Sequence, residues 1–418
     1  MLDESMLDAP DDLARADRRG LLRGAAEAGA RVRTALRNTE EAGVTALSPE
    51  GRPRSVMVAG SGAAATAVAD LVDSLAGAIA PVTHLRPTGV APVAGALHWS
   101  LPGWTGAVDL LLIVTTDGGE PGLGVLAEQA YRRGCTVVAV APRRSPLTET
   151  VDGARGLLVP LAANPPGRYE SPYAAPWRDE PGSGPEPGIA PRSERGTAPG
   201  ARPGTAAESG FGPESVAAGP GALWGLFTPL LVLLDRIGLI TAPNDVLERL
   251  ADRLDRVAER CGPAVATYDN PAKTLAVELA ESLPLIWTEG GAAPVGRRFA
   301  SALTELAGRP ALAAELPEAL EAHGALLRAP SGGGGDLDDF FRDRVEDAET
   351  LRPRVVLLRD RPAEGLTAAP TARETADAGN TPLSELEPEE GNALEALAEL
   401  VAVTDFTAAY LALAAPEG

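Results

Sequence analysis

The chain has 418 residues, enough for two domains with connecting segments. Its formal net charge of −21 argues against a nucleic-acid partner or an anionic membrane surface, because both need clustered basic side chains. Aromatic residues make up only 4% of the chain, so the core must consist mainly of Ala, Leu and Val. The two cysteines, Cys135 and Cys261, have no metal-binding spacing, and we expect both to be buried free thiols.

The sequence predicts neither a targeting segment nor a membrane span. Residues 1–4 are acidic and lack the basic start and apolar run of a signal peptide. The longest apolar stretch, near residues 223–234, is interrupted by Pro229 and is too short to cross a bilayer. We therefore expect a cytoplasmic protein.

The first part of the chain alternates apolar strands with helices. Residues 3–45 carry charges between Leu and Ala at helical spacing and predict two helices. Apolar runs then predict strands at residues 55–59, 81–85, 109–114, 136–141 and 156–161, with helices through residue 71 and over 121–133. This alternation indicates a parallel sheet covered on both faces. We assign residues 1–48 to N-terminal helices and residues 49–163 to a first domain.

Residues 164–214 have a different composition. Pro, Gly, Ser, Glu and Arg dominate this segment, and apolar periodicity disappears. Such a segment cannot bury enough apolar area to offset the entropy lost on ordering, so we expect a disordered linker.

Helical patterns return in residues 215–262, and a second alternation fills residues 263–418. It predicts helices at 271–282, 294–307, 317–327 and 392–413, and strands at 284–288, 310–315 and 354–359. We interpret residues 384–387 as a loop. Asp336, Asp338 and Asp339 are typical of a solvated acidic turn rather than a metal loop. The predicted fold is α/β: two doubly wound parallel-sheet domains, flanking helices and a Pro/Gly-rich insertion.

Three short sequences in the second half occur together in one known family. They are FTPLL at residues 227–231, NPAK at 270–273 and AELPE at 314–318. In this order they resemble segments of the bifunctional phosphoglucose/phosphomannose isomerases, which are built from two sugar isomerase (SIS) domains. The similarity runs through most of residues 50–415, outside the linker.

The resemblance implies a homodimeric aldose–ketose isomerase of hexose phosphates that uses no metal or other cofactor. In that family a glutamate moves a proton between C1 and C2, and a histidine helps to open the sugar ring. The matching positions imply Glu305 as the base and His323 as the ring-opening group. Glu305 lacks the family's two asparagine neighbours, and the spacing of His323 is altered. An exposed helix glutamate and an ordinary surface histidine stay open as alternatives.

The family holds the phosphate with hydroxyl-rich loops that follow strands. The implied substrate-binding residues are Gly60, Ser61, Gly62 and Thr66 in one loop, and Thr115, Thr116, Asp117 and Gly118 in another. A glycine-rich tight turn alone also explains the first loop.

Several family features are replaced in this chain. Asp117 and Glu120 stand where the family has hydroxyl side chains, and carboxylates there would repel a phosphate. At an effective dielectric near 20, a like-charge pair about 4 Å apart costs about 4 kcal/mol. A family arginine corresponds to Pro220, and the family's C-terminal lysine has no counterpart. Three functions therefore stay open: an isomerase, a sensor of a hexose phosphate or related carbohydrate derivative, and a dimeric scaffold.

Overall fold

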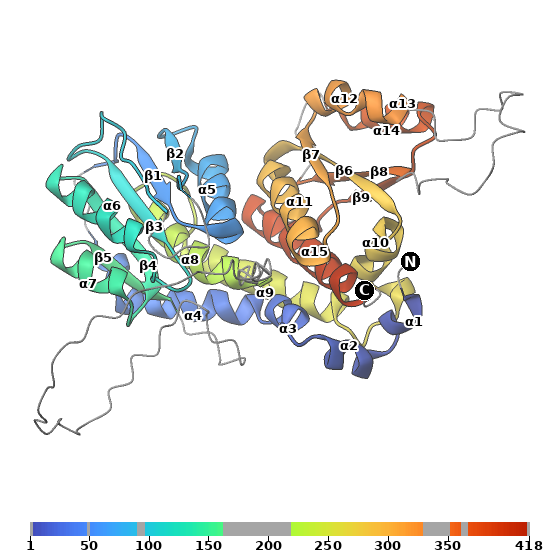
Figure 1. The fold of residues 1–418 in the computed structure, drawn as a ribbon, viewed down its shortest axis with the longest axis horizontal. Coiled ribbons are helices and arrows are strands. Elements are labelled where there is room, and N and C mark those ends of the chain that lie inside the picture. Colours follow the sequence, from blue (N-terminus) through green and yellow to red (C-terminus); the bar gives the residue numbers. More distant parts are fainter. Residues whose placement is uncertain are drawn as a thin grey trace, which may run out of the picture.

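The computed structural model describes residues 3–47, 51–89, 97–161, 219–328, 352–360 and 367–415. The predicted linker and the acidic turn at residues 336–339 lie outside these ranges. The described residues form two parallel sheets, each with helices on both faces (Figure 1). This arrangement confirms the predicted α/β fold.

The first sheet has five parallel strands in the order β2-β1-β3-β4-β5. Its strands are β1 (Val56–Ala59), β2 (Val82–Leu85), β3 (Leu110–Val114), β4 (Thr136–Pro142) and β5 (Leu157–Leu161). Its helices are α5 (Gly62–Ala76), α6 (Pro121–Arg132) and α7 (Pro146–Gly153). All five strands were predicted within two residues, whereas α7 was not predicted.

The second sheet has four parallel strands in the order β7-β6-β8-β9. Its strands are β6 (Ser282–Glu289), β7 (Leu312–Glu315), β8 (Arg352–Arg359) and β9 (Leu383–Leu386). Its helices are α10 (Pro271–Leu279), α11 (Ala293–Ala307), α12 (Glu318–Ala322), α13 (Gly324–Arg328), α14 (Ala369–Ala378) and α15 (Ala393–Leu413). The loop expected at residues 384–387 was wrong, because most of it belongs to β9, which pairs with β8.

The remaining helices run beneath both sheets and join them (Figure 1). They are α1 (Glu4–Leu7), α2 (Pro10–Ala16), α3 (Leu21–Ala26), α4 (Ala28–Glu41), α8 (Ala222–Arg236) and α9 (Asn244–Cys261). Two helices were expected before residue 45, and the structure has four α-helices there. The predicted helix 317–327 is likewise broken at His323 into α12 and α13.

The two sheets repeat one topology. Strands β6 to β9 occupy the order second-first-third-fourth, as β1 to β4 do in the first sheet. The helix that follows the first strand is therefore α5 in one domain and α11 in the other. These counterpart helices contact each other between the two sheets.

A single hydrophobic core joins the inner faces of both sheets. Val58 and Ile286 point into this core, whereas Met57 and Trp287, one residue away on each strand, point into separate outer cores. This follows from the two-residue side-chain period of a strand. The first outer core lies under α6 and α7, and the second lies under α12, α13 and α14.

Helix α15 is apolar enough and long enough to cross a membrane, judged by length and composition. However, 89% of its most apolar window is buried inside the protein, against α9, α10 and α11. We interpret it as a core helix. The sequence analysis tested only the stretch near residues 223–234 as a possible membrane span and overlooked this longer apolar helix.

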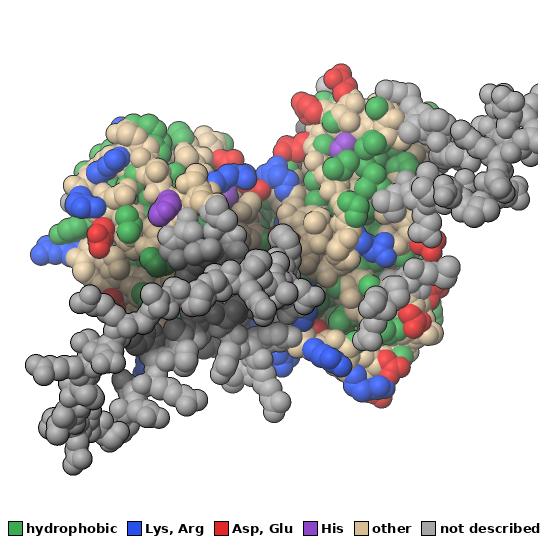
Figure 2. Space-filling model, viewed as in Figure 1, with side chains coloured by type: hydrophobic (Ala, Val, Ile, Leu, Met, Phe, Trp, Pro, Cys, Tyr) green, Lys and Arg blue, Asp and Glu red, His purple; other side chains and the backbone are tan. Residues whose placement is uncertain are grey.

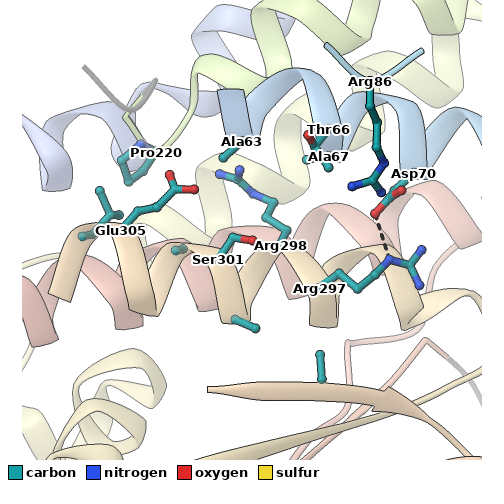
Figure 3. A pocket seen from close by; sticks show the side chains of 14 residues that line it. Ala63, Thr66, Ala67, Asp70, Arg86, Pro220, Arg297, Arg298, Ser301 and Glu305 are labelled. Carbon is teal, nitrogen blue, oxygen red and sulfur yellow. Dashed lines mark hydrogen bonds and ion pairs between the residues drawn. The ribbon is translucent and has the colours of Figure 1, made fainter. Parts of the chain in front are cut away.

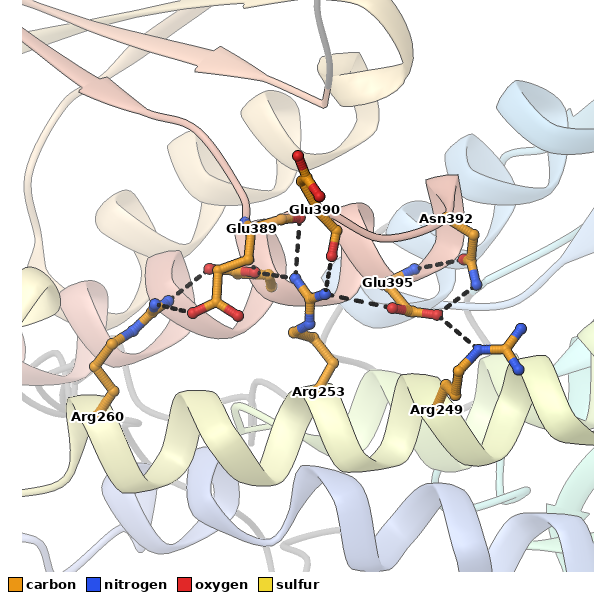
Figure 4. Close-up of polar contacts among 8 residues, drawn as sticks. Arg249, Arg253, Arg260, Glu389, Glu390, Asn392 and Glu395 are labelled. Atoms are coloured by element: carbon orange, nitrogen blue, oxygen red, sulfur yellow. Dashed lines mark hydrogen bonds and ion pairs between the residues drawn. The ribbon is translucent and has the colours of Figure 1, made fainter.

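A buried ion-pair network fastens α15 to α9 (Figure 4). The Arg253 guanidinium, 3% exposed, donates to Glu399 at 2.6 Å, to Glu395 at 3.3 Å and to two backbone carbonyls just before α15. Arg260 donates to the other oxygen of Glu399 at 2.6 Å. Burial alone would raise the pKa of Glu399, but the hydrogen bonds from Arg260 and Arg253 outweigh it and lower the pKa.

We expect Arg253→Ala to lower the free energy of unfolding by about 3–5 kcal/mol at pH 7, because it leaves buried carboxylates without their partner. A carboxylate with a lowered pKa stabilises the fold above its ordinary pKa of 4.5, and this contribution is lost as the pH falls through the lowered value. The cost should therefore shrink at about pH 3.

Urea unfolding at the two pH values measures this difference. Arg256→Ala, an exposed arginine on the same helix, is the matched control and should change stability by less than about 0.5 kcal/mol. An equal cost for the two variants at pH 7 would contradict a stabilising role of the network.

Candidate functional site

A cleft of about 310 Å³ lies between α5 and α11. Figure 2 shows the hollow between the two lobes, with basic and acidic side chains along it. The two helices run antiparallel across the cleft (Figure 3). Ala63, Pro220 and Glu305 lie at one end, and Asp70 and Arg297 lie at the other.

Three arginines line the cleft, and they differ in what they contact. Arg297 donates to Asp70 at 2.8 Å and to Glu315 at 3.0 Å. Arg298 pairs with Asp405 of α15. Arg86 directly follows β2 and is exposed, and it makes no hydrogen bond or ion pair with any residue that the structure describes. Arg86 is therefore a cation available to an anionic ligand.

Glu305 lies in the last turn of α11 and points across the cleft toward the first turn of α5 (Figure 3). Its side chain is open to the cleft, but the surrounding protein partly desolvates the carboxylate and raises its pKa, an effect that the charge of Arg298 partly offsets. A carboxylate with a raised pKa at the wall of a cleft is suited to accept a proton from a bound ligand.

His323 lies elsewhere. It is 6% exposed at the end of α12, in the outer core, and its Nδ1 accepts a hydrogen bond from Trp287 Nε1 at 2.9 Å. Burial lowers its pKa, and the accepted hydrogen bond also requires Nδ1 to be unprotonated. Because α11 covers the inner face of the sheet, one chain does not bring Glu305 and His323 together.

The first predicted phosphate loop leads directly into the cleft. Gly60 packs so closely on the Val114 backbone that a Cβ atom there would clash, and Gly62, with φ of 81°, begins α5. Ser61 is the N-cap residue, and its side chain makes no capping hydrogen bond. One turn further on, Thr66 lines the cleft and donates to the Gly62 carbonyl at 3.3 Å.

The second predicted loop closes on itself. Thr115 Oγ1 accepts from the Gly118 N–H at 3.0 Å, and Asp117 Oδ1 accepts from the Gly119 N–H at 3.0 Å. Glu120 caps α6, and Thr116 is exposed. The N–H groups of Gly118 and Gly119, which an anion would need, are thus already bound to the chain's own oxygen atoms.

Sequence reasoning missed the cleft arginines. Arg298 precedes Glu305 by seven residues, which is two helical turns and therefore the same helix face. This seven-residue spacing was the sequence pattern that could have placed Arg298 on the same side of the helix as Glu305. The chain's single lysine cannot serve the cleft, because Lys273 is buried and its Nζ donates to the carbonyls of Pro263 and Val265.

No group of three or more His, Cys, Asp and Glu side chains could hold a metal ion within the described ranges. Cys135 and Cys261 are buried free thiols, as expected. Burial raises the pKa of each thiol to about 11, so neither is a reactive thiolate near neutral pH.

Comparison with known proteins identifies the second domain. Residues 268–415 match the bacterial phospho-glucose isomerase C-terminal SIS domain. No curated protein matches the sequence. These residues therefore form a SIS domain of that bacterial family, which confirms the resemblance inferred from the sequence.

Solved structures similar to the whole chain include two proteins assigned as phosphosugar isomerases. One, from Clostridium difficile 630, has a TM-score of 0.54 at 11% identity and covers 94% of this chain and 95% of its own. The other, from Silicibacter pomeroyi DSS-3, has a TM-score of 0.51 at 17% identity and covers 93% and 96%. A hypothetical protein from Thermus thermophilus has a TM-score of 0.51 at 14% identity and covers 99% and 94%. At these identities the likeness establishes the fold alone, which is two parallel-sheet α/β domains in the described residues.

We expect removal of the Arg298 charge to raise the pKa of Glu305 further, because this cation favours the ionised carboxylate. The variant combines Arg298→Gln with Asp405→Asn, so that no buried charge is left alone. The measurement is an NMR titration of ¹³C-labelled glutamate, with the resonance assigned by its absence in Glu305→Gln. Arg297→Gln, one residue away, is the control and should shift this pKa less. A larger shift in the control would show that Arg298 does not face Glu305.

Proposed function

We propose that the protein binds a hexose phosphate in the α5–α11 cleft and interconverts its aldose and ketose forms, with Glu305 as the base. The observation that carries this proposal is the Glu305 carboxylate, which has a raised pKa and lies in a cleft lined by arginines. Membership of the second domain in a phosphoglucose isomerase SIS family supports the substrate class.

The geometry of the cleft suits a ligand with a negative charge at one end. Arg86, with Arg297 beside it, lies at the end away from Glu305 (Figure 3). We propose that Arg86 binds the phosphate, since its guanidinium has no partner among the described residues. The sugar would then extend past the Thr66 hydroxyl, with C1 and C2 near Glu305. The role of Gly60, Ser61 and Gly62 in phosphate binding stays a prediction.

The first test is Glu305→Gln, assayed with glucose 6-phosphate and mannose 6-phosphate by coupling to fructose 6-phosphate formation. Loss of a general base should lower kcat by about 10²–10⁴-fold. Calorimetry should show that substrate affinity changes little, because glutamine keeps the size of the side chain. Glu128→Gln, an exposed glutamate on α6, is the control and should keep full activity.

Unchanged kcat in Glu305→Gln would overturn the assignment of the base. Wild-type protein that binds hexose phosphates without turnover would instead support the second candidate, a carbohydrate sensor. The turn at Thr115–Gly119, whose N–H groups bond to its own side chains, is the observation that favours this second candidate.

We further propose that the protein is a cytoplasmic homodimer. Glu305 and His323 lie on opposite faces of one sheet, so a site that uses both residues must combine two chains. A two-fold dimer, the commonest assembly, would form two such sites.

Complementation tests this arrangement. Glu305→Gln and His323→Asn are each expected to lower activity, the latter while keeping an acceptor for Trp287. After co-refolding in equal amounts, half of the dimers should be mixed, each with one intact site of two. Activity should then recover to about a quarter of the wild-type value. Activity equal to the mean of the separate variants, or a monomeric mass by light scattering, would contradict a shared site.

A further inference from the structure

One polar contact joins the two sheet domains, and it lies in the cleft. Arg297 of α11 donates from Nε to Oδ2 of Asp70 on α5 at 2.8 Å (Figure 3). Among the described residues, this is the only hydrogen bond or ion pair between the first sheet domain, residues 51–161, and the second, residues 263–415. The two domains otherwise meet through the hydrophobic core that they share. A ligand that disturbs this pair therefore acts on the polar contact between the domains.

The Asp70 carboxylate also lies near Arg86, the cleft arginine without a partner among the described residues. Figure 3 shows the side chains of Arg86 and Asp70 close together at this end of the cleft. Both charges also act on His84: burial lowers the pKa of His84, the charge of Arg86 lowers it further, and the charge of Asp70 opposes these effects. An anion bound to Arg86 would therefore meet the negative charge of Asp70, which repels it.

Arg297 has the donors that a phosphate needs. Its Nη1 donates to Glu315 at 3.0 Å, which anchors the guanidinium from the second domain, and its Nη2 has no partner among the described residues. The side chains of Arg297 and Asp70 are 46% and 20% exposed, and ion pairs in contact with water contribute little to stability. A phosphate carries more charge than a carboxylate and can accept two parallel N–H bonds from one guanidinium. It can therefore take the place of Asp70 on Nε and also bind Nη2.

We infer that Asp70 is a built-in competitor for the phosphate of the ligand, an inference that rests on the proposed binding of hexose phosphates in this cleft. In the free protein Asp70 holds the Nε of Arg297. A phosphate bound to Arg86 takes over Nε and Nη2 of Arg297 and displaces the carboxylate. Binding thereby exchanges the polar contact between the domains for contacts with the ligand. Asp70 thus lowers the affinity of the cleft for phosphates and links their binding to the contact between the two domains.

Calorimetry with sorbitol 6-phosphate measures this competition, because this hexitol phosphate has no carbonyl group and cannot be isomerised. Asp70→Asn keeps the size of the side chain but removes its charge, so it should bind the ligand about tenfold more tightly than the wild type, or better. Arg297→Gln should bind it about tenfold more weakly or worse, because this variant lacks the donors and leaves Asp70 unpaired beside the phosphate.

The matched control is Asp152→Asn, which changes an exposed aspartate on α7 and removes the same charge far from the cleft. Its affinity should equal that of the wild type. Circular dichroism and thermal melting confirm that each variant is folded. A second measurement needs no change at Asp70: the Nε–H resonance of Arg297, assigned by its absence in Arg297→Gln, should shift when sorbitol 6-phosphate saturates the wild-type protein.

The outcomes are distinct for the two proposals. Equal affinity of the wild type and Asp70→Asn, or an Arg297 Nε–H resonance that does not move, would overturn the competition while leaving sugar-phosphate binding intact. An equal gain in Asp152→Asn would overturn it too, because net charge alone would then explain the effect. Failure of both the wild type and Asp70→Asn to bind sorbitol 6-phosphate or any hexose phosphate would overturn the proposed function itself, and the role of Asp70 with it.

Discussion

The hydrophobic core shared by the two sheets is the constraint on which the rest of the molecule depends. The inner faces of both sheets contribute to it, so the two counterpart helices, α5 and α11, are pressed against each other. Each helix packs its apolar side on the core and leaves its polar side at the rim. The charged cleft between the domains therefore follows from the packing, since this rim is where charged side chains from both helices can remain hydrated.

The same constraint explains how far the sequence could be interpreted. Strands such as β3 and β4 are almost wholly apolar because helices cover both faces, and such runs are easy to recognise. Strand β9 escaped detection because it lies at an edge and is only partly buried, and Glu385 in its middle pairs with Arg359 and Arg373. A short strand stabilised by ion pairs has no apolar pattern to find.

The candidate site could be predicted only in part, for a related reason. The family resemblance indicated Glu305 as a candidate base, because the residues that surround it in the sequence also surround it on α11. The partner that holds Arg298 is Asp405, 107 residues further along the chain, and no local pattern joins the two. Nor could sequence show that His323 and Glu305 lie on opposite faces of a sheet, because that depends on which helices cover which side.

The strand ends of both sheets bear on the proposal that an anionic ligand binds in the cleft, because each of them already holds a carboxylate. In the first domain Asp117 occupies the N–H group of Gly119 in the turn after β3. In the second domain the Glu289 carboxylate, at the end of β6, accepts from the Thr367 hydroxyl and from the N–H of Ala368 just before α14.

Hydrogen bonds from Thr367 and Ala368 and the charge of Arg359 outweigh burial and lower the pKa of Glu289, so this carboxylate remains ionised at neutral pH. Each domain thus supplies its own anion to a strand-end turn. A phosphate at either place would have to displace a carboxylate that is already bonded there, whereas the exposed Arg86 guanidinium has no partner among the described residues. This difference in available donors supports the proposal that an anionic ligand binds between α5 and α11.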